Sequence, residues 1–434
     1  MKLIWQKVIF IVGWIMTLMS VFMLFIQSVS RSYFHQDDVS EIAVTANWHG
    51  WSSLMINSGE HIIFTFWALL RTEWIIFGLN FTGYMVINSL LHLLVLLLIF
   101  NITHKLTKSL LWSSVAVWGF VINANWFVVV WWITSQMVLL STIFALVSFR
   151  ILLEIREKPR KIRYLFLYLF SILPGLSWGL GLSWPIWPLM VYGIDYKKRR
   201  ITPIGFSLIL AQLSLIIFYF VFVRNNLSAH TDPTTWLSSP LNILAFVVVG
   251  ISNTLVGRWL WPPENLTLRV IFLGILALVM YASRSCVKKI NKDMFFGAWV
   301  AFGCFLTFAI PRWKFGIGHA MANYFAYFPL AFLLISLCLL LSKIRLNKIK
   351  TILILGVFLI HIPLSWIGFE EWAREWVVRP QQTKQYFSYL NGLKTEDCID
   401  NEYLPEFVIP QKIWRVDYLW PVFQKDFDPF CEKK

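Results

Sequence analysis

The sequence predicts an all-α polytopic membrane protein, and three observations support this fold class: composition, hydropathy and the placement of basic residues. Of the 434 residues, 58% are hydrophobic and 14% are charged, and the mean hydropathy is +0.65. A soluble protein carries about 25% charged residues. Long apolar runs alternate with short basic clusters, which is typical of membrane-spanning helices joined by cytoplasmic loops. The same clustering argues against nucleic-acid binding, despite the net charge of +15.

Residues 1–368 are expected to form a transmembrane domain with about eleven spans. The first span has no small-x-small cleavage site after it and is interpreted as a retained helix rather than a signal peptide. A Pro- and Gly-rich segment at 174–185 predicts a break between the fifth and sixth spans. The expected spans are 8–27, 83–103, 110–125, 127–149, 164–175, 182–194, 201–223, 268–282, 294–310, 323–341 and 351–368.

Loop charge predicts the orientation. The predicted inner loops hold 22 Lys and Arg residues, whereas the outer segments before the tail hold about seven. This asymmetry predicts a multi-pass protein of the plasma or inner membrane, with its N-terminus cytoplasmic and its C-terminus outside. The run 241–261 is long enough to span, but crossing would move the basic loop 284–292 outside, so a re-entrant or interfacial element is expected. Segment 61–80 is predicted to be an amphipathic helix in the interface.

The tail, residues 369–434, is polar, aromatic and punctuated by prolines, and it is predicted to form a small extracytoplasmic cap. Cys398 and Cys431 are its only cysteines. They are expected to form a disulfide in an oxidising compartment, and to stay as two free thiols in a reducing one.

The first outer loop, residues 28–82, carries the first acidic cluster of the chain, formed by Asp37, Asp38 and Glu41. Adjacent carboxylates at a membrane boundary are costly, which favours a functional role. A carboxylate there can take a proton from a hydroxyl, and cations can stabilise a departing phosphate. A solvated rim of charge is the alternative, and it explains scattered charges better than it explains the adjacent pair. The same predicted face holds Glu60, His61, Arg71, Arg258, Arg312, Lys314 and His319.

No metal-ligand or nucleotide-binding spacing stands out, so no cofactor is expected, and a divalent metal, although possible, is not indicated. His92 lies within an expected span. It is either a hydrogen-bonded packing residue or part of the substrate site.

Several patterns resemble the GT-C membrane glycosyltransferases, and most closely the bacterial relatives of the O-mannosyltransferases. Phe34-x-x-Asp37-Asp38 follows the first span, and Gly83-Tyr84-x-x-x-Asn88-x-x-x-His92 opens the second. Arg312 and the sequence Asn323-Tyr324-Phe325 resemble an Arg-Tyr motif of that family. This chain has Asn323 where many relatives have arginine, and Glu60-His61 where many have Arg-Pro. The resemblance covers roughly the first 110 residues, and the remainder by topology only.

The resemblance implies a GT-C-like bundle, a polyprenyl- or dolichyl-phosphate sugar donor, and transfer to a glycan or lipid acceptor on the outer leaflet. It implies that Asp37 is the base, with Asp38 as second choice. Arg312 and Lys314 are expected to contact the donor phosphate, with Arg258 and His319 as weaker candidates. The remaining candidates for substrate binding are Glu60, His61, Arg71 and His92.

Two other functions compete with this one. A transporter or flippase for lipid-linked sugars would need paired half-repeats and polar residues at the bilayer midplane, and no clear repeat is visible. A polysaccharide polymerase or ligase would need a cavity that holds an oligosaccharide.

Overall fold

The structure is a computed structural model, and its described residues form mainly helices, with one short strand pair among them. It describes residues 2–34, 37–48, 50, 53, 63–123, 127–222, 240–256, 265–282, 291–312, 320, 322–343, 378–394, 397, 399, 403–405, 408 and 416–423.

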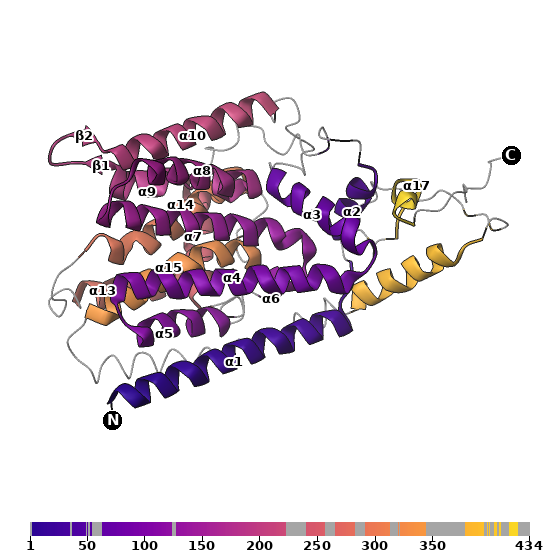
Figure 1. The fold of residues 1–434 in the computed structure, drawn as a ribbon, viewed down its shortest axis with the longest axis horizontal. Helices are drawn as coiled ribbons and strands as arrows, with labels where there is room; N and C mark the ends of the chain where they lie inside the picture. The colour runs from indigo at the N-terminus through magenta and orange to yellow at the C-terminus, as the bar shows by residue number, and fades with distance from the viewer. Residues whose placement is uncertain are drawn as a thin grey trace.

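Long helices lie side by side and form the body of the molecule (Figure 1). α14 packs along α15, α7 packs along α8, and α4 packs against both α5 and α7. Outward-facing apolar side chains such as Phe22, Leu97 and Phe220 stay exposed, as expected of helices that face lipid. The long helices are α1 (Lys2–Arg31), α4 (Phe81–Thr107), α5 (Leu110–Val121), α7 (Gln136–Glu157), α8 (Lys161–Ser177), α10 (Pro203–Phe222), α12 (Pro240–Val256), α13 (Leu266–Ala282), α14 (Asp293–Arg312) and α15 (Asn323–Lys343).

Within the described ranges, six helical segments are long and apolar enough to cross a membrane. This confirms an all-α chain of membrane-protein type, while the predicted total of about eleven spans stays a prediction. α12 has 17 residues and is one of the shorter apolar helices, so whether it crosses also stays a prediction. The expected span 351–368 lies outside the described residues. The six segments are Gly13–Arg31, Phe81–Thr107, Ile133–Glu157, Pro203–Val221, Asp293–Ile310 and Tyr324–Lys343.

The expected continuous helix 127–149 is wrong, because the chain breaks at Trp132. α6 (Phe127–Trp131) ends there, Trp132 is extended, and a 3-10 turn, η3 (Ile133–Ser135), leads into α7. The carbonyls of Val130 and Trp132 accept hydrogen bonds from the Asn88 amide, at 3.0 and 3.2 Å. These bonds stabilise the break because they satisfy buried backbone groups near it.

The expected helix 182–194 forms only over 186–193, and the predicted break at 174–185 is confirmed. After α8 the chain forms a 3-10 turn, this short irregular helix and a two-stranded hairpin. Gly181 lies so close to α8 that a Cβ there would be 2.0 Å from the Pro174 carbonyl oxygen, which only glycine permits. The elements are η4 (Gly179–Ser183), α9 (Ile186–Pro188), η5 (Leu189–Gly193), β1 (Ile194–Asp195) and β2 (Arg200–Ile201).

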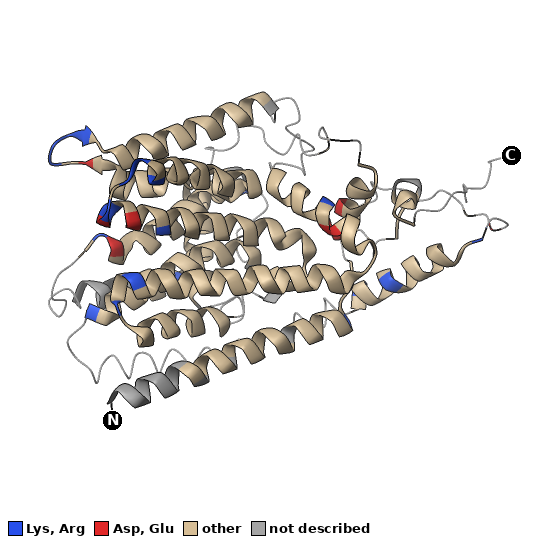
Figure 2. Cartoon of the chain, in the orientation of Figure 1, with Lys and Arg blue, Asp and Glu red and all other residues tan. Residues whose placement is uncertain are grey.

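The two ends of the bundle differ in charge. Lys and Arg gather at the end where the chain begins, together with several acidic residues, and a second group of acidic residues lies on two short helices at the opposite end (Figure 2). At the basic end, buried Asp293 accepts hydrogen bonds from Arg156 and from the Tyr192 hydroxyl, each at 2.7 Å, which joins α7 and η5 to α14. Lys105 pairs with Glu157 between α4 and α7. Sorting of basic residues to one end is the pattern of a cytoplasmic face.

Candidate functional site

The acidic end of the bundle is built by α2 (Asp37–Ala46) and α3 (Phe64–Phe77), which pack against each other beyond the end of α1 (Figures 1 and 2). Asp37 and Asp38 occupy the first turn of α2, where the helix dipole favours carboxylates. α17 (Val416–Leu419) and η11 (Trp420–Phe423) also pack on α2, so the C-terminal part of the chain borders the site.

Asp38 is buried and tied to another part of the chain. Its Oδ1 accepts hydrogen bonds from the Thr134 amide at 2.8 Å and from the Thr134 hydroxyl at 2.9 Å. Thr134 lies in η3, just before α7, so the carboxylate also lies at the start of a helix, where backbone amides lack partners. Asp38 therefore fixes α2 to the break between α6 and α7.

Asp37 differs from its neighbour in each of these respects. Its side chain is exposed, and among the described residues its carboxylate accepts no hydrogen bond and forms no ion pair. Surrounding protein still removes part of its hydration, and this desolvation raises the pKa of the Asp37 carboxyl. A higher pKa makes its carboxylate a stronger base.

A tyrosine and an arginine lie near Asp37 at this end of the bundle. The charges of Asp37 and Arg312 both reach the Tyr324 side chain, at the start of α15. Arg312 ends α14, and its guanidinium lies 5.7 Å from the centre of the Phe325 ring. Asp37 and Arg312 are far apart in sequence, yet both lie within electrostatic reach of Tyr324.

Tryptophans contribute an aromatic wall beside Tyr324. The Tyr324 ring centre lies 5.7 Å from that of Trp132 and 6.5 Å from that of Trp178, both in edge-on geometry. Trp178 is fully buried and Trp132 nearly so. These buried rings hold the Tyr324 side chain in place.

The motif at the start of α4 proves to be a column of polar side chains. Tyr84, Asn88 and His92 are four residues apart and therefore share one face of the helix. The Tyr84 hydroxyl donates to the Gly78 carbonyl at 2.8 Å, and Asn88 holds the break after α6. The His92 Nδ1 lies 2.8 Å from the Tyr327 hydroxyl, one helical turn below Tyr324. Each residue of the column holds a different neighbour of α4.

Glu73 is the buried carboxyl of α3, and its partner is distant in sequence. Gln136 Nε2 donates to its Oε1 at 2.8 Å, and its Oε2 has no partner among the described residues. Burial raises the pKa of Glu73 to about 8. The neighbouring Arg71 donates instead to the Thr45 carbonyl at 2.8 Å and lies over the Trp48 ring, so it joins α3 to α2.

The remaining predicted site residues lie outside the described residues: Glu60, His61, Arg258, Lys314 and His319. Cys398 and Cys431 lie outside them too, so the disulfide stays a prediction. Across the part of the chain that the structure describes, no group of three or more His, Cys, Asp or Glu side chains could hold a metal ion. The additional residues that the structure brings to the site are Thr134, Trp132, Trp178 and Gln136. None of the four was expected from the sequence, and Trp132 and Thr134 fall inside the predicted span 127–149.

The fold and the apolar helices define the class of this chain as an all-α, multi-pass membrane protein. No family model matches the chain, and neither does any curated protein or solved structure with which it was compared.

Proposed function

We propose that this chain is a membrane glycosyltransferase that moves a sugar from a polyprenyl-phosphate donor to a glycan or lipid acceptor of the cell envelope. One observation carries the proposal: Asp37, exposed and free of hydrogen bonds and ion pairs among the described residues, lies with Arg312 around Tyr324. A base and a cation in one place are what the transfer of a sugar from a lipid phosphate requires. The resemblance to the GT-C family supports the same reading.

The proposed step balances as a substitution at the anomeric carbon. The acceptor hydroxyl attacks that carbon, and its proton passes to the Asp37 carboxylate. The new acceptor–carbon bond forms as the bond from the anomeric carbon to the phosphate oxygen breaks. Polyprenyl phosphate leaves with the bonding electron pair, and Arg312 stabilises its growing negative charge.

The contrast between the two aspartates favours Asp37 as the base. Among the described residues nothing bonds to the Asp37 carboxylate, whereas Asp38 already accepts two hydrogen bonds from Thr134. We assign Asp38 to holding α2 in place. Lys314, His319 and Arg258 remain proposed phosphate contacts, and Glu60 and His61 remain proposed substrate contacts.

Arg71 and His92 receive positioning roles under this proposal. Arg71 bonds to α2, which carries Asp37, and His92 bonds to Tyr327 on the helix that carries Tyr324. We further propose that the acidic end faces outward and that the basic end is cytoplasmic, since basic residues prefer the cytoplasmic side.

The proposal is tested in cells in which Asp37→Asn replaces the natural chain. We expect polyprenyl-phosphate sugar to accumulate and an envelope glycan or lipid to lose the mass of one sugar, as measured by mass spectrometry. If the protein were a flippase, its loss would leave the donor on the inner leaflet, and this effect would not require Asp37 to act as a base. Unchanged donor and envelope masses in the variant would contradict the proposal.

A further inference from the structure

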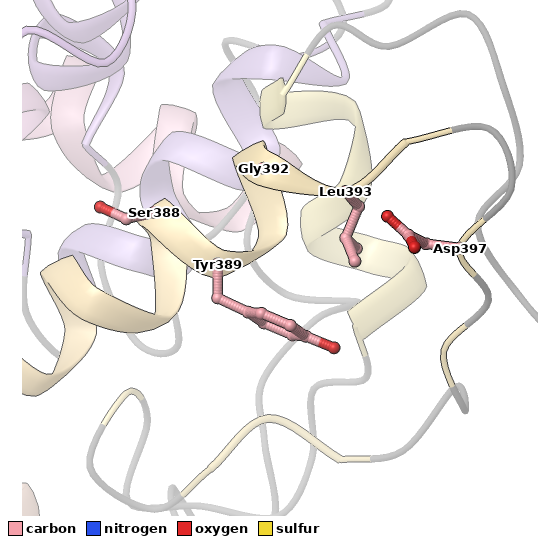
Figure 3. A pocket seen from close by; sticks show the side chains of 5 residues that line it. All are labelled: Ser388, Tyr389, Gly392, Leu393 and Asp397. Carbon is pink, nitrogen blue, oxygen red and sulfur yellow. The ribbon is translucent and has the colours of Figure 1, made fainter.

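A hollow of about 400 Å³ lies in the C-terminal part of the chain, away from the acidic end of the bundle helices. Ser388, Tyr389, Gly392, Leu393 and Asp397 line it (Figure 3). Four of these residues come from the helix 378–392 or its immediate end, and Asp397 comes from the turn that follows. Its volume is within the range of small-molecule sites, about 300–1,000 Å³.

The lining combines an aromatic ring with a carboxylate. Tyr389 is 55% exposed, so its ring offers a free face to a ligand. Asp397 lies across the hollow, with Leu393 between the two side chains (Figure 3). One Asp397 oxygen accepts from the Lys394 amide at 2.7 Å, which fixes the carboxylate and leaves its Oδ1 to accept further donors.

This combination fits a saccharide better than a lipid tail or an anion. A pyranose ring has a face of C–H groups, which packs on an aromatic ring, and an edge of hydroxyls, which donate to a carboxylate. Among the described residues that line the hollow, Leu393 alone has an aliphatic side chain, which is too little apolar lining for a lipid tail. A phosphate would meet the negative charge of Asp397.

The helix 378–392 links this hollow to the acidic end of the bundle. Phe387, on its opposite face, is buried, and its ring stacks on Phe34 at 6.3 Å and meets Tyr33 edge-on at 5.7 Å. Phe34 precedes the Asp37-Asp38 pair by three residues. The hollow is therefore carried by an element that is packed on the segment leading into α2.

We propose that this hollow binds a saccharide, and, in a step that rests on the proposed function, that the saccharide is part of the acceptor glycan. The pocket would hold one end of that glycan while another part reaches Asp37. Its sugar binding does not require Asp37, which makes the two proposals separable.

Gly392 allows a clean test, because a Cβ added there meets nothing within 4 Å. Gly392→Trp should fill the hollow without disturbing the helix, and Tyr389→Ala should remove the ring. Val378→Trp is the matched control: Val378 is exposed on the same helix, about four turns away and on nearly the same face.

The purified full-length protein is applied to an array of defined oligosaccharides of mannose, glucose, galactose, rhamnose and N-acetylglucosamine. We expect wild type, Asp37→Asn and Val378→Trp to retain the same glycans, and Gly392→Trp and Tyr389→Ala to bind them at least about tenfold more weakly. No retained glycan for the wild type, or equal binding by Gly392→Trp, would overturn the pocket. If Asp37→Asn bound glycans and also transferred sugar at the normal rate, the result would count against the proposed function and leave the pocket intact.

Discussion

Asp38 and Thr134 are joined by two hydrogen bonds across 96 residues of sequence, and these bonds fix α2 to the start of α7. The adjacent Asp37 makes no such contact among the described residues. Two adjacent aspartates thus differ in their contacts: Asp38 holds two elements together, and Asp37 is the one proposed to act as a base.

Removing the Asp38 carboxylate should destabilise the protein. Asp38→Ala leaves the Thr134 amide and hydroxyl without their acceptor, at a cost of about 1–3 kcal/mol in the free energy of unfolding. Thr134→Val keeps the hydrogen bond from the backbone amide to Asp38, so it should lower the free energy of unfolding by less, about 0.5–1.5 kcal/mol. Thermal unfolding in detergent measures both, with Asp37→Ala as the control that should melt like wild type. If Asp38→Ala melted like wild type as well, Asp38 would not be the anchor of α2.

Glu73 should make stability depend on pH. Its pKa is raised to about 8 in the folded protein, so the folded state favours the protonated acid. The stability that this group contributes is therefore complete below its unfolded pKa of about 4.5 and is lost as pH rises through about 8. We expect the melting temperature of wild type to fall over that interval.

Glu73→Gln is the matched variant, because its amide cannot ionise and its oxygen still accepts from Gln136. The variant should lack the part of the fall that Glu73 causes. Parallel pH curves for the two proteins would show that the Glu73 carboxyl keeps an ordinary pKa.

The contact of His92 with Tyr327 should couple α4 to α15. In a double-mutant cycle with His92→Phe and Tyr327→Phe, we expect a coupling of about 0.5–1.5 kcal/mol in unfolding free energy. The double variant should then lose less stability than the sum of the two single losses. Strictly additive losses would show that the two side chains act independently.

Arg312 should be needed for transfer more than for folding. Arg312→Ala removes the cation beside Tyr324, and the rate of transfer should fall by about 10²–10³-fold, as when an oxyanion-hole donor is lost. Arg312→Lys keeps the charge but lacks the guanidinium fork, so its transfer rate should lie between those of wild type and Arg312→Ala. Arg379→Ala, on the exposed C-terminal helix, is the control cation. A transfer rate for Arg312→Ala equal to that of the control would remove Arg312 from the site.

Hydropathy predicted the long helices well, because most of them are long, continuous apolar runs in the sequence. α10, α14 and α15 begin and end within a few residues of the expected spans. The break at Trp132 was invisible, since the residues on both sides are equally apolar. Its cause, the Asn88 amide, lies on another helix.

The acidic pair marked a candidate site in the sequence, but the separate roles of its two aspartates could not be predicted. Only the fold shows that Thr134 donates two hydrogen bonds to Asp38. Likewise, nothing in the local sequence around Glu73 reveals Gln136 as its partner. The spacing of Tyr84, Asn88 and His92 did place them on one helical face, although their separate partners could not be predicted.

The central claim, that Asp37 is the base, is tested most directly by measuring transfer in proteoliposomes. The donor is the polyprenyl-phosphate sugar that accumulates in cells carrying Asp37→Asn, and the release of polyprenyl phosphate is followed with native envelope acceptor. We predict that Asp37→Asn melts like wild type and transfers about 10²–10⁴-fold more slowly. We also predict that the wild-type rate rises with pH through the raised pKa of Asp37, since the base must be ionised. An Asp37→Asn protein that transfers sugar at the wild-type rate would contradict the account.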